Sequence, residues 1–257
     1  MKKRRRGIYL LPNLFTTSAL FAGFYAIVSA INSRFEAAAI AIFVAMILDG
    51  MDGRIARLTH TQSDFGVQYD SLSDLISFGL APALTVYLWS LQGLGKLGWS
   101  AAFIYAAATA LRLARFNTQA ATEDKRFFQG LASPAAAALI AGMVWLGDSY
   151  QLQDGAGVVI FTLPLTVIAG ILMVSNIRYH SFKQIDLRGK VPFVAILVVV
   201  FVYFFFATNP PLILFLAALI YAASGPILTL VLLRRHRASR KPPGENAAEH
   251  EGEKEPE

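Results

Sequence analysis

Cysteine is absent from this chain, and charged residues are scarce. Among its 257 residues, Asp, Glu, Lys and Arg together make up 16%, and no position holds Cys. Without Cys, a disulfide framework, a thiol nucleophile and a thiolate metal site are all excluded. Neither a G-x-S-x-G pattern nor a P-loop occurs. A histidine-based mechanism has no support either, because each His falls in an expected loop or in the tail: His60, His180, His236 and His250.

Apolar sequence dominates instead. Hydrophobic residues account for 55% of the chain, and the mean hydropathy is +0.50. Such an excess is typical of a polytopic membrane protein and not of a globular or disordered chain. We predict an all-α membrane helical bundle of about eight transmembrane helices, each near the roughly 20 residues needed to cross a bilayer. The expected spans are 11–31, 37–57, 68–90, 98–116, 132–149, 156–175, 191–207 and 211–233. If the last two fuse across Asn209-Pro-Pro211, the number becomes seven.

The distribution of basic residues predicts the orientation of these spans. The net charge is +6, but Lys and Arg gather at the ends of apolar segments, which fits membrane topology and anionic headgroups better than nucleic acid. With the N-terminus inside, most of them fall in the loops 117–131 and 176–190 and after residue 233, all on the cytoplasmic side. We therefore expect a multi-pass protein of the cell (inner) membrane with both termini cytoplasmic. Its membrane domain is expected over 1–237, followed by a disordered tail over 238–257.

Four acidic residues stand out against this apolar background. Asp49 and Asp52 end one apolar stretch, and Asp70 and Asp74 begin the next. A carboxylate at membrane depth costs roughly 2.5–3.5 kcal/mol, so its presence there indicates a function. The first pair is three residues apart and the second is four apart, so each pair shares one helical face. If the two helices run antiparallel through a short connection, the pairs meet at one depth.

This cluster predicts a site for divalent metal ions. Four carboxylates within a few ångströms cannot all stay ionised without counter-charge. Their hard oxygen ligands suit Mg²⁺ or Mn²⁺, and two ions are readily accommodated. Beside the acids, Gly53 and Ala56 remove side-chain bulk and let a ligand approach the backbone closely. Arg57 adds one fixed cation for a phosphate.

The full spacing from Asp49 to Asp74 is D-x-x-D-G-x-x-A-R-x8-G-x3-D-x3-D, with Gly66 as the isolated glycine. It matches the signature of the CDP-alcohol phosphatidyltransferases without a departure, and the chain resembles that family from Leu11 to about Pro134. Within the family, two flanks resemble the phosphatidylserine synthases. They are Asp70-Ser-Leu-Ser-Asp74-Leu-Ile-Ser-Phe-Gly-Leu-Ala-Pro82 and Ala110-Leu-Arg112-Leu-Ala-Arg115-Phe-Asn117.

This resemblance implies an enzyme that moves the phosphatidyl group of CDP-diacylglycerol to the hydroxyl of L-serine, giving phosphatidylserine and CMP. It implies that divalent ions bridge the carboxylates and the pyrophosphate, with Asp74 also acting as the general base. The distribution of basic residues places this site on the cytoplasmic side. A homodimer is a family expectation. The implied metal ligands are Asp49, Asp52, Asp70 and Asp74. The implied CDP-binding residues are Asp49, Asp52, Gly53, Ala56, Arg57, Gly66 and Asp70.

A second constellation lies at the end of the fourth expected span. Arg112 and Arg115 are three residues apart, and Asn117 follows just beyond. The two arginines either reach out to lipid headgroups or face the site and hold a carboxylate or phosphate. The resemblance favours the second role, with the serine carboxylate or a lipid phosphate as the ligand. Ser71 and Ser73 either cap the third span or line the acceptor pocket, and the sequence does not decide between these roles.

Other activities compete with this interpretation. The motif handles the shared donor, so glycerol phosphate, inositol, inositol phosphate and a phosphatidyl group are alternative acceptors, and only the two flanks favour serine. A transporter with an acidic ion site would also carry buried carboxylates, but the sequence has no repeated halves of the kind typical of transporters. An unrelated phospholipase-D-like route needs a His-x-Lys pair, and His180 and Lys183 are spaced one residue too far apart.

Overall fold

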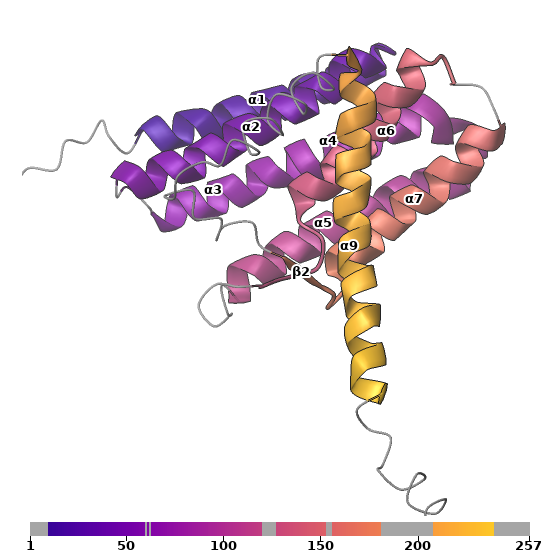
Figure 1. Cartoon of the computed structure of the whole chain (residues 1–257). Coiled ribbons are helices and arrows are strands. Elements are labelled where there is room, and N and C mark those ends of the chain that lie inside the picture. Colours follow the sequence, from indigo (N-terminus) through magenta and orange to yellow (C-terminus); the bar gives the residue numbers. More distant parts are fainter. Residues whose placement is uncertain are drawn as a thin grey trace, which may run out of the picture.

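The computed structural model describes residues 10–59, 61, 63–119, 127–152, 156–180 and 208–238, and these residues are almost entirely helical (Figure 1). Two short strands, which pair antiparallel, are the exception to the predicted all-α fold in this part of the chain. The first three helical segments are α1 (Leu10–Ile31), α2 (Phe35–Thr59) and a continuous segment from Asp64 to Leu94, here called the third helix. The remaining elements are α5 (Lys96–Gln119), β1 (Phe127–Gln129), α6 (Ser133–Ser149), α7 (Ala156–Val174), β2 (Arg178–His180) and α9 (Pro210–Ala238).

Within the described ranges, five helices are long and apolar enough to cross a membrane. They are Pro12–Ile31, Asp64–Leu94, Lys96–Thr118, Gly157–Val174 and Pro210–Leu230. Acidic side chains interrupt the apolar sequence of α2, and α6 is only 17 residues long. The predicted span 191–207 and the tail beyond residue 238 lie outside the described residues, so the number of eight spans stays a prediction.

The third helix begins four residues earlier than the apolar pattern predicts, at Asp64, because Ser63 caps it. The Ser63 hydroxyl accepts a hydrogen bond from the backbone N–H of Gly66 at 3.1 Å. This bond satisfies one of the donors that every helix start leaves free. The cap lets the polar turn 64–69 join the apolar helix, so the acidic residues that follow sit on regular helical structure.

The third helix is not uniform along its length. Its α-helical parts, α3 (Asp64–Asp74) and α4 (Ala81–Val86), are joined by a π-helical turn over Leu75–Leu80. Pro82 explains the turn, because proline lacks the N–H that an α-helix needs at that position and its ring crowds the preceding turn. The wider π-helical turn relieves this conflict directly after Asp74, and such turns are frequent at functional sites.

Helix α1 packs along α2 through small side chains. Small residues let helices in a membrane approach closely, which strengthens van der Waals packing where no hydrophobic driving force exists. The buried cluster at this contact contains Ala22, Ala26 and Ala30 of α1 and Ala38, Ala39, Ala41 and Ala45 of α2. The seam holds α2, and with it Asp49 and Asp52, against α1.

On its other side α1 contacts the third helix and runs parallel to it. The Ser73 hydroxyl donates to the backbone carbonyl of Thr16 at 3.2 Å, and the Ser77 hydroxyl donates to that of Ala19 at 3.1 Å. One turn further on, a Cβ at Gly23 would lie 2.7 Å from the Cα of Ser77, so only glycine permits this approach. Ser73 therefore bonds to α1 and joins two helices.

The second half of the chain packs around the third helix. α5 lies against α7, and α6 lies between α2 and α9, which crosses the front of the bundle in Figure 1. Tyr179 of β2 is fully buried, and its hydroxyl donates to the carbonyl of Ala222 on α9 at 3.0 Å. The strand pair therefore ties the segments after α5 and α7 to α9.

Candidate active site

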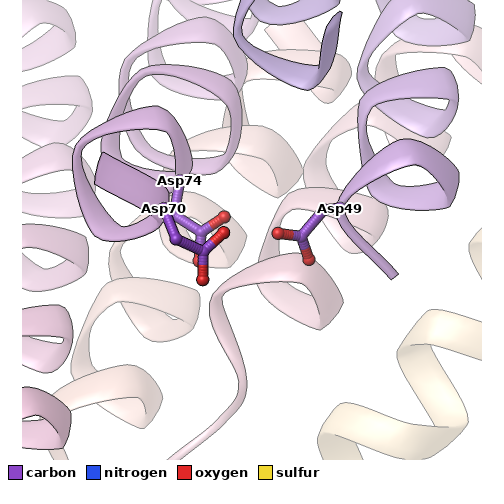
Figure 2. A group of neighbouring side chains, drawn as sticks. All are labelled: Asp49, Asp70 and Asp74. Atoms are coloured by element: carbon purple, nitrogen blue, oxygen red, sulfur yellow. The ribbon is translucent and has the colours of Figure 1, made fainter. Parts of the chain in front are cut away.

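Three carboxylates of the acidic motif point toward one another. Asp49 comes from α2, and Asp70 and Asp74 come from α3 (Figure 2). One oxygen from each residue can be chosen so that all three atoms lie within 4.8 Å of one another. Asp49 is within hydrogen-bonding reach of both other carboxyl groups. The structure thus brings together three of the four residues that the sequence predicts as metal ligands.

The carboxylates meet because they lie at similar distances from the connection between α2 and α3. Asp49 lies ten residues before the end of α2 at Thr59, which is about 15 Å of α-helix. Asp70 and Asp74 lie six and ten residues after the start of α3 at Asp64, which is about 9 and 15 Å. A short connection between antiparallel helices therefore carries the carboxylates to a similar depth.

Asp52 has a different partner. Its side chain is buried, with 6% of its surface exposed, and its Oδ2 accepts a hydrogen bond of 2.7 Å from the hydroxyl of Thr16 on α1. It is not part of the close group of three, although its charge interacts with that of Asp49. Thr16 therefore fixes the fourth carboxylate beside the cluster.

A cavity of about 430 Å³ opens on one side of the acids. Every residue of the predicted CDP-binding set except Asp49 lines it. A Cβ at Gly66 would lie 3.2 Å from the Ser63 hydroxyl oxygen and 3.7 Å from Oδ1 of Asn13, so glycine keeps this wall open. The lining residues from the motif are Asp52, Gly53, Ala56, Arg57, Gly66 and Asp70.

A second cavity of about 420 Å³ shares part of this wall. Asp49 and Asp74 line it, together with Arg112 and Asn117 of α5 and Ser133 at the start of α6. Both cavities are lined by Asp52, Gly53, Arg57, Val67 and Asp70. The acidic cluster therefore lies where two cavities of similar size meet.

Arg112 brings a second cation to this cavity, which Arg57 also lines. Its NH1 group donates a hydrogen bond of 2.8 Å to the Ser133 hydroxyl, and its charge interacts with that of Asp74. The Nε atom of Arg112 is buried and has no hydrogen-bond partner. Nearby, the Asn117 amide nitrogen donates to the hydroxyl of Ser71 at 3.0 Å. An anionic ligand in this cavity would meet a guanidinium that the bond to Ser133 holds in position.

Arg115 faces elsewhere, so the predicted arginine pair is split. Its guanidinium donates to the backbone carbonyl of Val174 at 3.2 Å and to Oδ1 of Asn176 at 2.6 Å. It does not line either cavity around the acids. Arg115 instead joins the end of α5 to the end of α7.

Two further site residues escaped the sequence reasoning. Ser133, which orients Arg112, lies 21 residues further along the chain. Its only signal was a Ser-Pro pair ahead of an apolar run, which is typical of a helix start. Thr16 belongs to the stretch Pro12-Asn13-Leu-Phe-Thr16, which is typical of a helix start and leaves a polar contact to substrate open. Nothing in its spacing connects it with Asp52.

The donor set fits a divalent cation. Oδ1 of Asp70 is buried and lacks a hydrogen-bond partner, which is costly for a carboxylate oxygen unless a cation or donor meets it. Three convergent carboxylates also repel one another, and a hard cation with oxygen preference relieves both problems. Asp49, Asp70 and Asp74 are the residues placed to hold it.

Replacement of Asp70 by Asn should weaken Mn²⁺ binding by roughly tenfold or more, since a neutral amide replaces a charged ligand. Titration of the purified protein by calorimetry or by Mn²⁺ electron paramagnetic resonance measures this. Asp64→Asn, on the same helix but outside the cluster, is the matched control and should leave the affinity unchanged. Equal affinities for both variants would contradict a metal site at the cluster.

Comparison with known proteins places this site in a family. A family model described as CDP-alcohol phosphatidyltransferase matches residues 9–172. The chain is 41% identical over 191 residues to a CDP-diacylglycerol–serine O-phosphatidyltransferase of Helicobacter pylori, covering 74% of this chain and 80% of the relative. For the enzyme of the same name from Mycobacterium bovis, identity is 36% over 192 residues, covering 71% and 66%. For that of Bacillus subtilis it is 30% over 174 residues, covering 68% and 92%. This chain belongs to the CDP-alcohol phosphatidyltransferase family.

Proposed function

We propose that this protein transfers the phosphatidyl group of CDP-diacylglycerol to L-serine, giving phosphatidylserine and CMP. The observation that carries the proposal is the meeting of two cavities at the acidic cluster, since a donor in one and an acceptor in the other would react there. The relatives from Helicobacter pylori and Bacillus subtilis, which are named for this reaction, support the choice of substrates.

The first cavity is proposed to hold the CDP part of the donor. Gly53 and Gly66 leave its walls open, and Arg57 brings a fixed positive charge to a pyrophosphate. The outer faces of α1 and α2 form an apolar groove of about 470 Å³ that begins beside the acids, at Ser18 and Leu48. Diacylglycerol chains would remain in the bilayer along such surfaces while the headgroup reacts.

The family depends on divalent metals, and the carboxylates offer them a fitting site. We propose two ions, Mg²⁺ or Mn²⁺, held by the four motif acids. When bound, they supply positive charge that screens the pyrophosphate and stabilises the departing CMP. The chain's own contribution is to hold the ligands in position, and the hydrogen bond from Thr16 to Asp52 is one part of this. The proposed ligands are Asp49, Asp52, Asp70 and Asp74.

The second cavity is proposed to bind the acceptor. Arg112 would hold the serine carboxylate through its guanidinium, and Asn117 with Ser71 would hydrogen-bond the rest of the amino acid. Asp74 would take the proton of the serine hydroxyl. As the proton leaves, the serine oxygen forms a bond to the β-phosphorus, and the bond from that phosphorus to the CMP oxygen breaks. Arg115 is not included in this set, because its partners lie at the end of α7.

The orientation and assembly are proposed from the sequence. Basic residues in the loops and near the end of α9 favour a site that faces the cytoplasm at the inner membrane, with eight spans within residues 1–237 and both termini cytoplasmic. A cytoplasmic site would give access to a nucleotide-activated donor and to free serine. We also propose a homodimer, as the family resemblance implies.

With CDP-diacylglycerol and Mg²⁺ or Mn²⁺, L-serine alone should drive CMP release by the purified protein in detergent. Glycerol 3-phosphate and inositol, each offered separately, should not, because inositol carries no anionic group for Arg112 and glycerol 3-phosphate carries a larger phosphate in place of the carboxylate. Release driven by another alcohol would keep the phosphatidyl transfer and reject serine as the acceptor. No release with any acceptor would count against the enzyme and favour an ion-transport role for the acids.

Asp74→Asn should lower the turnover number by about 10²–10⁴-fold, the range expected when a general base is lost. Binding of CDP-diacylglycerol should persist, because the first cavity keeps its walls. CMP release under saturating substrates and donor binding by calorimetry measure the two effects separately. A near-normal turnover number would remove Asp74 from the role of base.

Arg112→Ala should raise the KM for serine by roughly tenfold or more, because a charge-assisted hydrogen bond is lost. Arg115→Ala is the matched comparison, from the same helix and with the same loss of charge. It should lower the thermal midpoint through its lost contacts to α7 and leave the KM for serine near its original value. Equal increases in the KM for serine in both variants would support the prediction that both arginines bind the acceptor.

A further inference from the structure

The third helix and α5 are joined by a buried hydrogen bond whose two residues line neither cavity. The Tyr105 hydroxyl of α5 donates to the backbone carbonyl of Phe78 at 3.1 Å, and both side chains are fully buried. Neither residue lines a cavity around the acids. In a helix bundle within lipid, water does not compete for such a bond. The bond therefore fixes the axial register of the two helices.

Pro82 leaves the carbonyl of Phe78 without its α-helical hydrogen-bond donor. In an α-helix, the carbonyl of residue 78 would accept from the N–H of residue 82, and proline has none. The π-helical turn Leu75–Leu80 lies at this point. The Tyr105 hydroxyl, which comes from a different helix, supplies a donor to that carbonyl.

This bond lies in line with the reactive residues. Asp74 precedes Phe78 by four residues, one turn along the same face of the third helix. Arg112 follows Tyr105 by seven residues, two turns along the same face of α5, and its charge interacts with that of Asp74. The two helices run antiparallel. The axial register set by Tyr105 and Phe78 therefore determines the position of Arg112 relative to Asp74.

Two other contacts agree with this register. A Cβ at Gly79 would lie 3.2 Å from the Cβ and Cγ2 atoms of Thr109, so the helices approach closely there. At the cytoplasmic end proposed above, Asn117 bonds to Ser71. That last pair lines the second cavity, so a ligand competes for its hydrogen bonds. The Tyr105 bond is the one that a ligand leaves intact.

We propose that Tyr105 is a positioning residue that fixes the axial register of α5 relative to the third helix. In this way it holds Arg112 opposite Asp74, where the acceptor would bind. This inference rests on the proposed function. It also gives a physical role to the stretch Ser77–Pro82, which resembles serine-using enzymes although it lines neither cavity. That stretch acts on the acceptor site through the bond between Phe78 and Tyr105.

The test is Tyr105→Phe in the full-length protein, with CMP release measured against serine and against CDP-diacylglycerol. The variant keeps the ring and removes only the hydroxyl. The KM for serine should rise by roughly tenfold, in line with the loss of one buried hydrogen bond that holds Arg112 in position. The KM for the donor should change by less than about twofold, because the residues that line the first cavity keep their positions.

Thr85→Val is the matched control. The Thr85 hydroxyl is fully buried and donates to a backbone carbonyl of the same helix, that of Ala81, at 2.7 Å. Its loss should lower the thermal midpoint of the protein without moving either KM, because the bond joins no second helix. Gly79→Ala is a second variant of the same contact. It adds a methyl group against Thr109 and removes no hydrogen bond, and it should also raise the KM for serine selectively.

Three outcomes separate the inference from the proposed function. A selective rise in the KM for serine in Tyr105→Phe, or in Gly79→Ala if the first variant folds poorly, supports the positioning role. An unchanged KM for serine, or an equal rise for serine and donor, overturns it and leaves Tyr105 as a packing residue. Failure of the unmodified protein to use serine, with CMP released by another acceptor, would instead overturn the proposed function.

Discussion

Mutual repulsion among carboxylates at the ends of apolar helices is the constraint on which the rest of the structure depends. Asp49, Asp70 and Asp74 converge although each would be more stable apart and in water. The surrounding helices must therefore be held firmly enough to keep them together. Alanine packing between α1 and α2 does this on one side, and serine hydroxyls bonded to α1 carbonyls do it on the other. The polar bonds between helices thus maintain a charge arrangement that a cation completes.

Much of the site follows from spacing alone, and the rest depends on contacts that no spacing encodes. Residues three and four apart share a helical face, so the convergence of Asp49 with Asp70 and Asp74 was predictable once the two helices were expected to be antiparallel. The partner of Asp52 was not predictable, because Thr16 lies on another helix. Arg112 and Arg115 look equivalent in sequence, yet Arg115 is hydrogen-bonded to Asn176 just beyond the end of α7.

The fold itself was predictable to a similar degree. Long apolar runs predict helices, and the helical segments that the structure describes fall close to the expected ranges. The π-helical turn Leu75–Leu80 was not predicted, because a local signal, Pro82, acts inside an apolar run that would otherwise continue as a regular α-helix. The strand pair β1 and β2 was missed, because three residues are too few for any periodic pattern to appear.

The shared wall of the two cavities has a stereochemical consequence for the proposed reaction. If the donor's CMP lies in one cavity and the serine hydroxyl enters from the other, the entering and leaving oxygens lie on opposite sides of the phosphorus atom. Each transfer is then a single in-line displacement, with both substrates present at once and no phosphorylated form of the protein between them. A phosphorus centre made chiral by isotopic labelling would leave such a site with its configuration inverted.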